Sequence, residues 1–216
     1  DGPGFLVNRI LTPFINEALY LLDEGVPIDE LEQACLQFGM PTGPCHLLDE
    51  VGIDVGHKVI SMLNQATGHR FKPAAIYEKL FDLGYCGKRS NKGFFRYDDQ
   101  GRELEINKDI LKLLPAQRIR MSEEEIQKRV IIPMINEAAT VLQDQVVKTV
   151  EEIDLGLVFG VGFPRFRGGL LRYADSQGLE NILRALDEYA RDSDAKRFEA
   201  CSLIREMVKK QETFYN

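Results

Sequence analysis

An internal repeat divides this chain of 216 residues into two related halves. The segments Arg9 to Ala18 and Arg129 to Ala138 share Arg, Pro, Ile, Asn, Glu and Ala in the same order, at an offset of 120 residues (129 − 9). The offset grows along the chain, which predicts an insertion in the second copy around residues 163–166. Ordered self-similarity over this distance predicts two copies of one structural unit. The further matches pair Phe38-Gly39 with Phe159-Gly160, Pro41 with Pro164, and Asp49-x-x-Gly52 with Asp175-x-x-Gly178.

Both copies open with a helical pattern of apolar residues. Pro13 and Pro133 fall inside these patterns, which favours either a kinked helix or a helix that starts later. A kinked helix fits better, because the apolar spacing continues on both sides of each proline. The patterns are formed by Leu11, Phe14, Ile15, Ala18 and Leu22 in the first copy and by Ile126, Val130, Met134, Ala138 and Val141 in the second.

Local capping sequences mark two helix starts in the second copy. Ser122 with Glu125, and Thr149 with Glu152, have the spacing of a capping box. The second box predicts a short helix that runs through residue 158 and stops near Gly160. Further helices are expected over residues 54–67, 178–191 and 193–210.

The middle of the chain, from Tyr85 to Arg118, is rich in Lys, Gly and Asp. Its segment 91–97 fits a turn followed by a short extended piece, and residues 98–115 fit a linker with one short helix. The sequence contains no βαβ pattern and no sustained strand alternation, so the predicted fold class is all-α or nearly so. We expect a first repeat over residues 1–97, a linker over 98–121 and a second repeat over 122–216.

Charge and apolar content exclude two classes of function. The formal net charge of −7 leaves no basic stripe for nucleic acid or an anionic membrane surface. The longest apolar runs, such as Leu155 to Val161, are short and interrupted by glycine, so no membrane span is predicted.

The cysteines and the first residues suggest a cellular context. Cys35, Cys45, Cys86 and Cys201 have no spacing typical of a zinc site, so no metal is expected. Free thiols favour a reducing compartment, which is the cytoplasm or, in a eukaryote, an organelle matrix. The chain opens on Asp1 without an initiator Met or a leader, which indicates a segment of a longer polypeptide.

Two motifs resemble catalytic or cofactor sites only superficially. Gly160-x-Gly162 follows a helical pattern rather than a strand, and Arg165 occupies the third glycine position of a dinucleotide fingerprint. A glycine-rich bend that lets helices approach closely is the better interpretation. His46 and Glu50 lie four residues apart and fit either a base–orienter pair or an ordinary surface contact. The surface contact is favoured, because nothing else in the sequence completes a catalytic or metal site.

Polar residues inside the helical patterns divide into shared and unshared ones. The Asn-Glu pairs at residues 16–17 and 136–137 occur in both copies, as do Arg9 and Arg129. A structural role at chain ends or helix termini is therefore favoured over catalysis. Asn8 occurs only in the first copy, and Lys128 replaces it in the second. The Asn8 side chain fits either a helix cap or an amide donor to a substrate carbonyl, and the residues alone leave both open.

An ordered set of motifs covers nearly the whole chain and resembles the C-terminal domain of L-3-hydroxyacyl-CoA dehydrogenases. The duplicated form resembles that of multifunctional β-oxidation enzymes, such as the α-subunit of the bacterial fatty acid oxidation complex. This resemblance rests on residues 2–9 (Gly-Pro-Gly-Phe-Leu-Val-Asn-Arg), 39–44 (Gly-Met-Pro-Thr-Gly-Pro), 48–54 (Leu-Asp-x-x-Gly-Ile-Asp), 91–97 (Asn-Lys-Gly-Phe-Phe-Arg-Tyr) and 159–164 (Phe-Gly-Val-Gly-Phe-Pro).

The resemblance implies NAD-dependent oxidation of an L-3-hydroxyacyl-CoA to the 3-oxoacyl-CoA. Family members bind NAD in an upstream Rossmann domain that also holds a catalytic His–Glu pair, and neither feature occurs in this sequence. No catalytic residue and no cofactor site are therefore expected within the chain, which should be inactive alone. Multifunctional members also carry an enoyl-CoA hydratase domain further upstream.

Two substrate-binding residues follow from the resemblance. Asn8 matches the substrate-contacting Asn of the family. Phe159 stands where relatives have a Tyr, so the ring is retained while a hydrogen bond from its hydroxyl is not possible. The motif from Pro41 to Pro44 is expected to be architectural.

The duplication implies an intrachain pseudo-dimer. Single-copy relatives dimerise through this helical domain, and a second copy on the same chain supplies that face internally. The copies are thus expected to pack together with approximate two-fold symmetry, with only the first contacting the acyl-CoA. Two alternatives are a non-catalytic helical module that docks a partner such as a thiolase subunit, and a self-sufficient enzyme built around His46.

Overall fold

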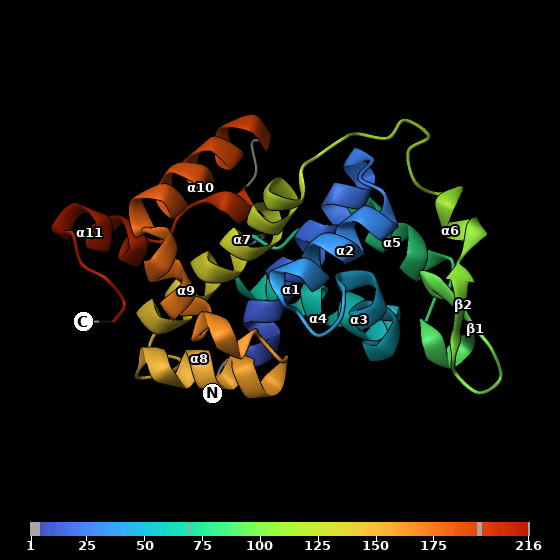
Figure 1. The fold of residues 1–216 in the computed structure, drawn as a ribbon, viewed down its shortest axis with the longest axis horizontal. Helices are drawn as coiled ribbons and strands as arrows, with labels where there is room; N and C mark the ends of the chain where they lie inside the picture. The colour runs from blue at the N-terminus through green and yellow to red at the C-terminus, as the bar shows by residue number, and fades with distance from the viewer. Residues whose placement is uncertain (1–4, 69, 194–195, 216) are drawn as a thin grey trace.

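The computed structural model describes residues 5–68, 70–193 and 196–215 of the chain. Within this part the regular secondary structure is helical apart from one two-stranded sheet, which confirms the predicted fold class (Figure 1). The first copy contains α1 (Phe5–Glu24), α2 (Ile28–Phe38), α3 (Pro44–Val51), α4 (Ile53–Ala66) and α5 (Ala75–Asp82). The second contains α7 (Glu123–Gln143), α8 (Val150–Gly160), α9 (Leu170–Gln177), α10 (Leu179–Ser193) and α11 (Ser202–Lys210).

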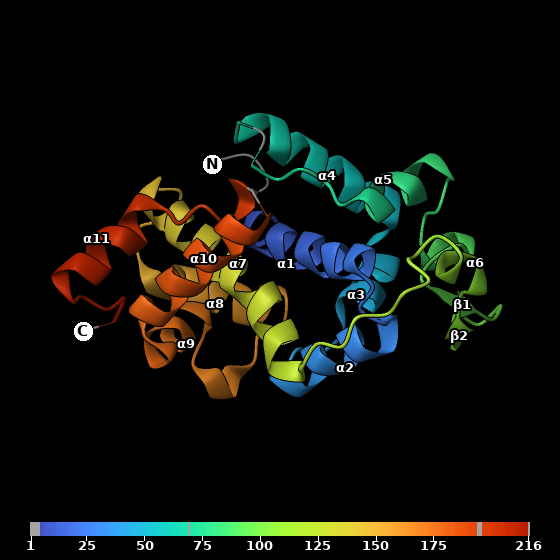
Figure 2. The same ribbon diagram turned by 90° about the horizontal axis from the view of Figure 1, so that it is seen from above.

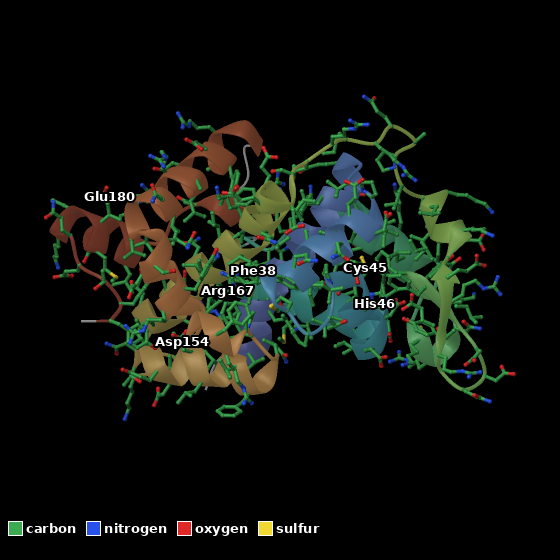
Figure 3. The ribbon with its side chains drawn as sticks, in the orientation of Figure 1. Phe38, Cys45, His46, Asp154, Arg167 and Glu180 are labelled. Atoms are coloured by element: carbon green, nitrogen blue, oxygen red, sulfur yellow. The ribbon has the colours of Figure 1, made fainter. Side chains whose placement is uncertain are left out.

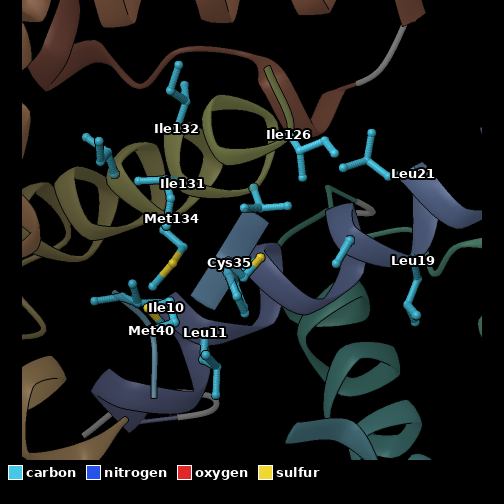
Figure 4. Close-up of a cluster of buried hydrophobic side chains, with 14 of the residues drawn as sticks. Ile10, Leu11, Leu19, Leu21, Cys35, Met40, Ile126, Ile131, Ile132 and Met134 are labelled. Carbon is cyan, nitrogen blue, oxygen red and sulfur yellow. The ribbon is translucent and has the colours of Figure 1, made fainter. Parts of the chain in front are cut away.

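The long helices α1 and α7 pack against one another at the centre of the molecule, with the remaining helices around them (Figures 1 and 2). Both helices continue through their prolines, Pro13 and Pro133, so neither starts late. Apolar side chains from α1, α2 and α7 close this central layer, among them Ile10, Cys35 and Met134 (Figure 4). The two copies therefore share one hydrophobic core and form the predicted intrachain pseudo-dimer.

The helices of the two copies correspond one to one. Offsets between equivalent helices rise from 122 for α2 and α8 (150 − 28) to 126 for α3 and α9 (170 − 44), so four residues are inserted before α9. This confirms the predicted insertion, which contains the short 3-10 turn Arg165–Arg167. The offset of 122 pairs Phe38 with Gly160 rather than with Phe159. The sequence match of Phe38 with Phe159 was wrong, because Phe38 is buried and Phe159 is exposed.

A small hairpin follows α5 and the 3-10 turn Lys88–Ser90, at the edge of the first copy (Figure 1). Strand β1 (Phe95–Tyr97) pairs antiparallel with β2 (Glu103–Ile106), with Phe95 opposite Ile106, and α6 (Lys108–Leu111) follows. The extended piece and the short helix were predicted, whereas β2 was not. Asp49 anchors the hairpin by accepting hydrogen bonds from the Phe94 and Phe95 amides.

The predicted helix starts at the caps are confirmed. The Ser122 hydroxyl accepts from the Glu125 amide and the Glu125 carboxylate accepts from the Ser122 amide, which completes a capping box. The Thr149 hydroxyl likewise caps α8 by accepting from the Glu152 amide. Helices α4 and α10 lie where the sequence placed them, at residues 53–66 and 179–193.

The predicted continuous helix over residues 193–210 is wrong. A 3-10 turn (Lys196–Phe198) and α11, which starts at Ser202, replace it in the described part of this segment, and residues 194 and 195 lie outside the described residues. The physical reason is a buried side chain: Asn136 donates to the Glu199 carbonyl and accepts from the Cys201 amide. These two bonds hold the chain out of the helical conformation just before α11.

No helix in the described ranges is long and apolar enough to cross a membrane. The four cysteines are free thiols; Cys35, Cys45 and Cys201 are buried and Cys86 is partly exposed.

Candidate functional site

Two buried carboxylates join the copies by reciprocal ion pairs. Glu137 of the second copy accepts from Arg9 Nε at 2.6 Å and from Arg70 Nη2 at 2.5 Å, both of the first copy. Glu17 of the first copy accepts from Arg129 Nη2 at 2.5 Å and from Arg197 Nε at 2.6 Å, both of the second. The repetition of this pattern in both directions gives the interface its approximate two-fold symmetry. These arginines and carboxylates therefore have a structural role, as their occurrence in both copies predicted.

The two repeated asparagines fix the start of the last helix in each copy. Asn16 donates to the Lys72 carbonyl at 2.8 Å and accepts from the Ala74 amide at 3.0 Å, directly before α5. Asn136 makes the equivalent pair of bonds before α11. Both are almost completely buried. The predicted role at helix termini is confirmed.

Asn8 lies three residues inside α1 and is exposed. It does not occupy the N-cap position, so the capping interpretation is wrong. The Asn8 carbonyl accepts a hydrogen bond from the Thr12 hydroxyl at 2.7 Å, as part of the helix. Asn8 also lines a groove between α1 and α4. The first residues of the family motif, Gly2 to Gly4, lie outside the described residues.

This groove has a mostly apolar lining, and we call it the first groove. It encloses about 110 Å³ between α1 and α4, with α5 beneath. Asn8 and Thr12 supply the polar groups on its α1 wall. Gly56 brings the backbone of α4 close to the Tyr77 hydroxyl, where a side chain on residue 56 would collide. The other lining residues are Leu11, Ile15, Val51, Val55, Val59 and Ile60.

Phe159 lies at the end of α8 with 73% of its surface exposed. The Arg165 guanidinium carbon stands 5.6 Å from the centre of its ring. Next to Phe159, a β-carbon on Gly160 would lie 2.9 Å from Val7 of α1, the residue before Asn8. The structure thus brings the two residues predicted to bind substrate to the same end of the molecule, one from each copy.

The glycine-rich bend after Phe159 allows the second copy to pack closely against the first. A β-carbon on Gly162 would lie 2.8 Å from Pro41 of the first copy. Beyond the bend, Arg167 donates to the Phe38 carbonyl at 2.9 Å and stacks over the Phe38 ring (Figure 3). The interpretation as a close-approach bend is confirmed. These glycines face apolar side chains from α1 and the loop after α2, so they do not form a cradle for a dinucleotide phosphate.

His46 does not pair with Glu50, so the favoured surface contact between them is wrong and the alternative base–orienter pair does not form either. Its two ring nitrogens contact the carboxylates of Glu32 and Glu103, and its ring stacks on Phe95 with 3.7 Å between centroids. Burial lowers the pKa of His46, but the two carboxylates outweigh it and raise the pKa to about 9. A permanently protonated imidazole between two carboxylates is a poor general base at neutral pH. Glu50 instead binds Lys88.

The chain matches the family described as "3-hydroxyacyl-CoA dehydrogenase, C-terminal domain" over residues 4–97 and 126–214, and it belongs to this family. Two matched segments on one chain agree with the two helical copies.

Within this family, the chain is similar to bacterial proteins named fatty acid oxidation complex subunit alpha. It is 40% identical to the subunit from Idiomarina loihiensis and 39% identical to that from Vibrio parahaemolyticus, over its full length in both cases. The chain spans about 30% of the length of these relatives.

Solved structures support the fold. A 3-hydroxybutyryl-CoA dehydrogenase from Escherichia coli superposes on 96% of this chain with a TM-score of 0.75, at 22% identity and over 60% of its own length. The dehydrogenase part of multifunctional enzyme 1 from C. elegans covers 92% of this chain and 46% of its own, with a TM-score of 0.68 and 22% identity. At this identity the likeness establishes the fold alone.

The first groove was not identified from the sequence. Its lining comes from four helices, α1, α3, α4 and α5, and most of its residues are ordinary members of apolar helical patterns. One signal was available: Val51, at the end of α3, and Val55 and Val59 of α4 repeat every four residues, and Val51 and Val55 are exposed in the fold. Exposed valines in such a row indicate an apolar surface that is not part of the core.

Proposed function

We propose that the chain is the substrate-side and dimer-like part of an NAD-dependent L-3-hydroxyacyl-CoA dehydrogenase of fatty acid β-oxidation. Membership of the dehydrogenase C-terminal-domain family and the naming of its relatives support this proposal. The single observation that carries it is the position of Asn8, which lines an apolar groove at the end of α1 where Gly160, next to the exposed Phe159, packs against Val7.

In this proposal Asn8 donates its amide to a carbonyl oxygen of the acyl-CoA and thereby orients the substrate. Phe159 packs its ring against the same molecule without contributing a hydrogen bond. The NAD and the catalytic His–Glu pair belong to an upstream Rossmann domain, as the family resemblance implies, and in this chain Val7 and Pro41 pack against the glycines of Gly160-x-Gly162. NAD would accept the hydride there. The residues of this chain bind the acyl-CoA and position it.

The second copy acts in this proposal as a built-in dimerisation partner. Its arginines and carboxylates complete the buried ion pairs of the first copy, and the linker makes their association unimolecular. We further propose that the repeats span residues 1–97 and 122–216, that the parent polypeptide is a cytoplasmic multifunctional subunit, and that it carries an enoyl-CoA hydratase domain. A thiolase subunit is its proposed partner.

The proposal is tested by measuring dehydrogenase turnover when the chain and a Rossmann domain are supplied as separate polypeptides. The chain is mixed with a Rossmann domain from a fatty acid oxidation α-subunit, and NADH formation is followed with 3-hydroxybutyryl-CoA. We expect no turnover by the chain alone, and turnover in the mixture that falls at least tenfold in Asn8→Ala, because a hydrogen bond to a substrate oxygen is worth about 1.5 kcal/mol. Lys128→Ala changes the equivalent position in the second copy and serves as the matched control.

Three results would contradict the proposal. Turnover by the chain alone would mean a self-sufficient enzyme. Equal activity of Asn8→Ala and the unmodified chain would remove the substrate role of the first copy. An equal loss in Asn8→Ala and Lys128→Ala would assign the effect to the fold rather than to substrate binding.

A further inference from the structure

Phe38, the last residue of α2 in the first copy, is enclosed by side chains of the second copy. Only 1% of its surface is exposed. The rings of Phe163 and Tyr173 meet it edge-on, with centroids 5.9 and 5.2 Å away. The Arg167 guanidinium lies 3.9 Å from the centre of the Phe38 ring, and Arg167 Nε donates to the Phe38 carbonyl at 2.9 Å (Figure 3). We call Phe163, Arg167 and Tyr173 the Phe38 socket.

The socket has no equivalent in the first copy. The loop between α8 and α9, which carries Arg167, has nine residues (170 − 160 − 1), whereas the loop between α2 and α3 has five (44 − 38 − 1). The shorter loop, Gly39 to Gly43, contains no arginine and no aromatic residue. Leu47 occupies the position of Tyr173 (173 − 126). The first copy therefore has the ring but nothing that would enclose an equivalent ring.

The ring, in turn, has no equivalent in the second copy. Gly160 occupies the position of Phe38 (38 + 122). A β-carbon on Gly160 would lie 2.9 Å from Val7 of α1, so a ring is not tolerated there. The second copy therefore has the socket without the ring, and the two meet only where a first copy pairs with a second.

The buried ion pairs do not distinguish the copies. Arg9 and Glu17 of the first copy have equivalents in Arg129 and Glu137 of the second, so these ion pairs are compatible with two identical copies as well. The ring and the socket are not. Two first copies paired in the same way would leave two Phe38 rings without their cover, which is unfavourable for apolar surface. Two second copies would leave two sockets empty, and each arginine would lose both the ring beneath it and the carbonyl that it binds.

We propose that the Phe38 ring and its socket determine which copies pair: they select a first copy with a second copy and disfavour pairs of two identical copies. The partner that this surface of the first copy fits is thus a second copy, on the same chain or on another molecule of it. The inference goes beyond the proposed function, because it concerns the choice of partner and not the binding of substrate.

Arg167 is the part of the socket that can be removed with least damage to the core, because it is only partly buried. It contributes a hydrogen bond from a charged donor and a cation stacked on an aromatic ring. Together these interactions should stabilise the pair by at least about tenfold in its dissociation constant.

Exchange of copies between nicked molecules tests the inference. A protease site is inserted at the exposed residue Ala116 of the linker and cut after folding, so that the copies stay paired without a covalent link. The nicked protein is mixed with the same protein labelled with a heavy isotope, and native mass spectrometry follows the pairs. We expect every pair to contain one first and one second copy, with labelled and unlabelled copies mixed at equilibrium.

Variants of the socket should loosen the pair. Arg167→Ala should exchange its copies at least about tenfold faster than the unmodified protein. Tyr173→Leu, which gives the socket the residue of the first copy, should also exchange faster. The matched control is Arg165→Ala, because this neighbouring arginine lies over Phe159 of its own copy; its exchange should equal that of the unmodified protein. Both socket residues are partly exposed, so circular dichroism of the variants should match that of the unmodified chain.

Three outcomes overturn the inference. Pairs of two identical copies, in the proportion expected for random pairing, would mean that the copies are not selected. Equal exchange rates in Arg167→Ala and Arg165→Ala would mean that the socket does not hold the pair. Copies that separate as soon as the linker is cut would mean that the covalent link alone keeps them together. None of these outcomes bears on the substrate role of Asn8, which is read from turnover.

Discussion

Removal of Glu137 should destabilise the protein far more than removal of its exposed neighbour. The Glu137 side chain is 2% exposed and lies between the guanidinium groups of Arg9 and Arg70. Glu137→Ala leaves both cations without their shared partner, and breaking a buried pair from one side costs about 3–5 kcal/mol. Asp144 also binds Arg9 but is 43% exposed, so Asp144→Ala should cost about 0–1 kcal/mol.

Urea unfolding at pH 7 measures this difference through the free energy of unfolding. Because the copies share one core, we expect a single transition for the unmodified chain. A loss of 3–5 kcal/mol lowers the melting temperature by roughly 6–20 °C in a protein of this size. Glu17→Ala should reproduce the effect, since Glu17 holds the symmetry-related pair of arginines.

A variant without the three charges tests why Glu137→Ala is destabilising. The cause is either that Arg9 and Arg70 are left buried without a partner or that packing is lost. The triple variant Arg9→Met/Arg70→Met/Glu137→Leu removes all three charges and retains apolar volume. It should recover most of the stability lost in Glu137→Ala, because apolar replacement of buried ion pairs is often neutral or stabilising. The reasoning fails if Glu137→Ala and Asp144→Ala differ by less than about 1 kcal/mol, or if the triple variant is no more stable than the single one.

Two further predictions concern titration and thiol chemistry. Because the pKa of His46 is about 9 in the folded protein and ~6.5 in an unfolded chain, its stabilising contribution is complete below pH 6.5 and is lost as the pH rises through 9. Urea unfolding across this range should show a decline of about 1–2 kcal/mol, reduced by solvent screening, that is absent in His46→Gln. A thiol reagent should modify Cys86 rapidly in the native protein and the other three cysteines only on unfolding, because these are buried; mass spectrometry finding early modification of Cys35 would contradict the packing of α2.

The features that the sequence predicts well are those set by neighbouring residues or by the repeat. Capping boxes depend on side chains three residues apart, and both Ser122 and Thr149 begin helices as expected. The crosswise ion pairs depend on residues 128 positions apart, as for Arg9 and Glu137. The occurrence of these Arg and Glu residues in both copies indicated a structural role. It did not indicate that each carboxylate binds arginines of the other copy.

The predictions that failed did so because of contacts between residues far apart in the sequence. The break before α11 arises from Asn136, 65 residues away in sequence from the amide that it binds. His46 finds its partners on α2 and β2 rather than on its own helix. The floor of the first groove depends on the close approach of α4 to α5, where Gly56 meets Tyr77, and helical periodicity does not reveal such an approach.

The division of labour between the copies yields a last prediction. Both buried carboxylates are satisfied within one chain, so the interface between α1 and α7 needs no second molecule. The unfolding midpoint should therefore not depend on protein concentration, whereas a dimer held by the same contacts would become more stable as concentration rises. Urea midpoints measured over a hundredfold range of concentration should coincide. A midpoint that rises with concentration would mean that the interface forms between chains, and the second copy would then not act as a built-in partner.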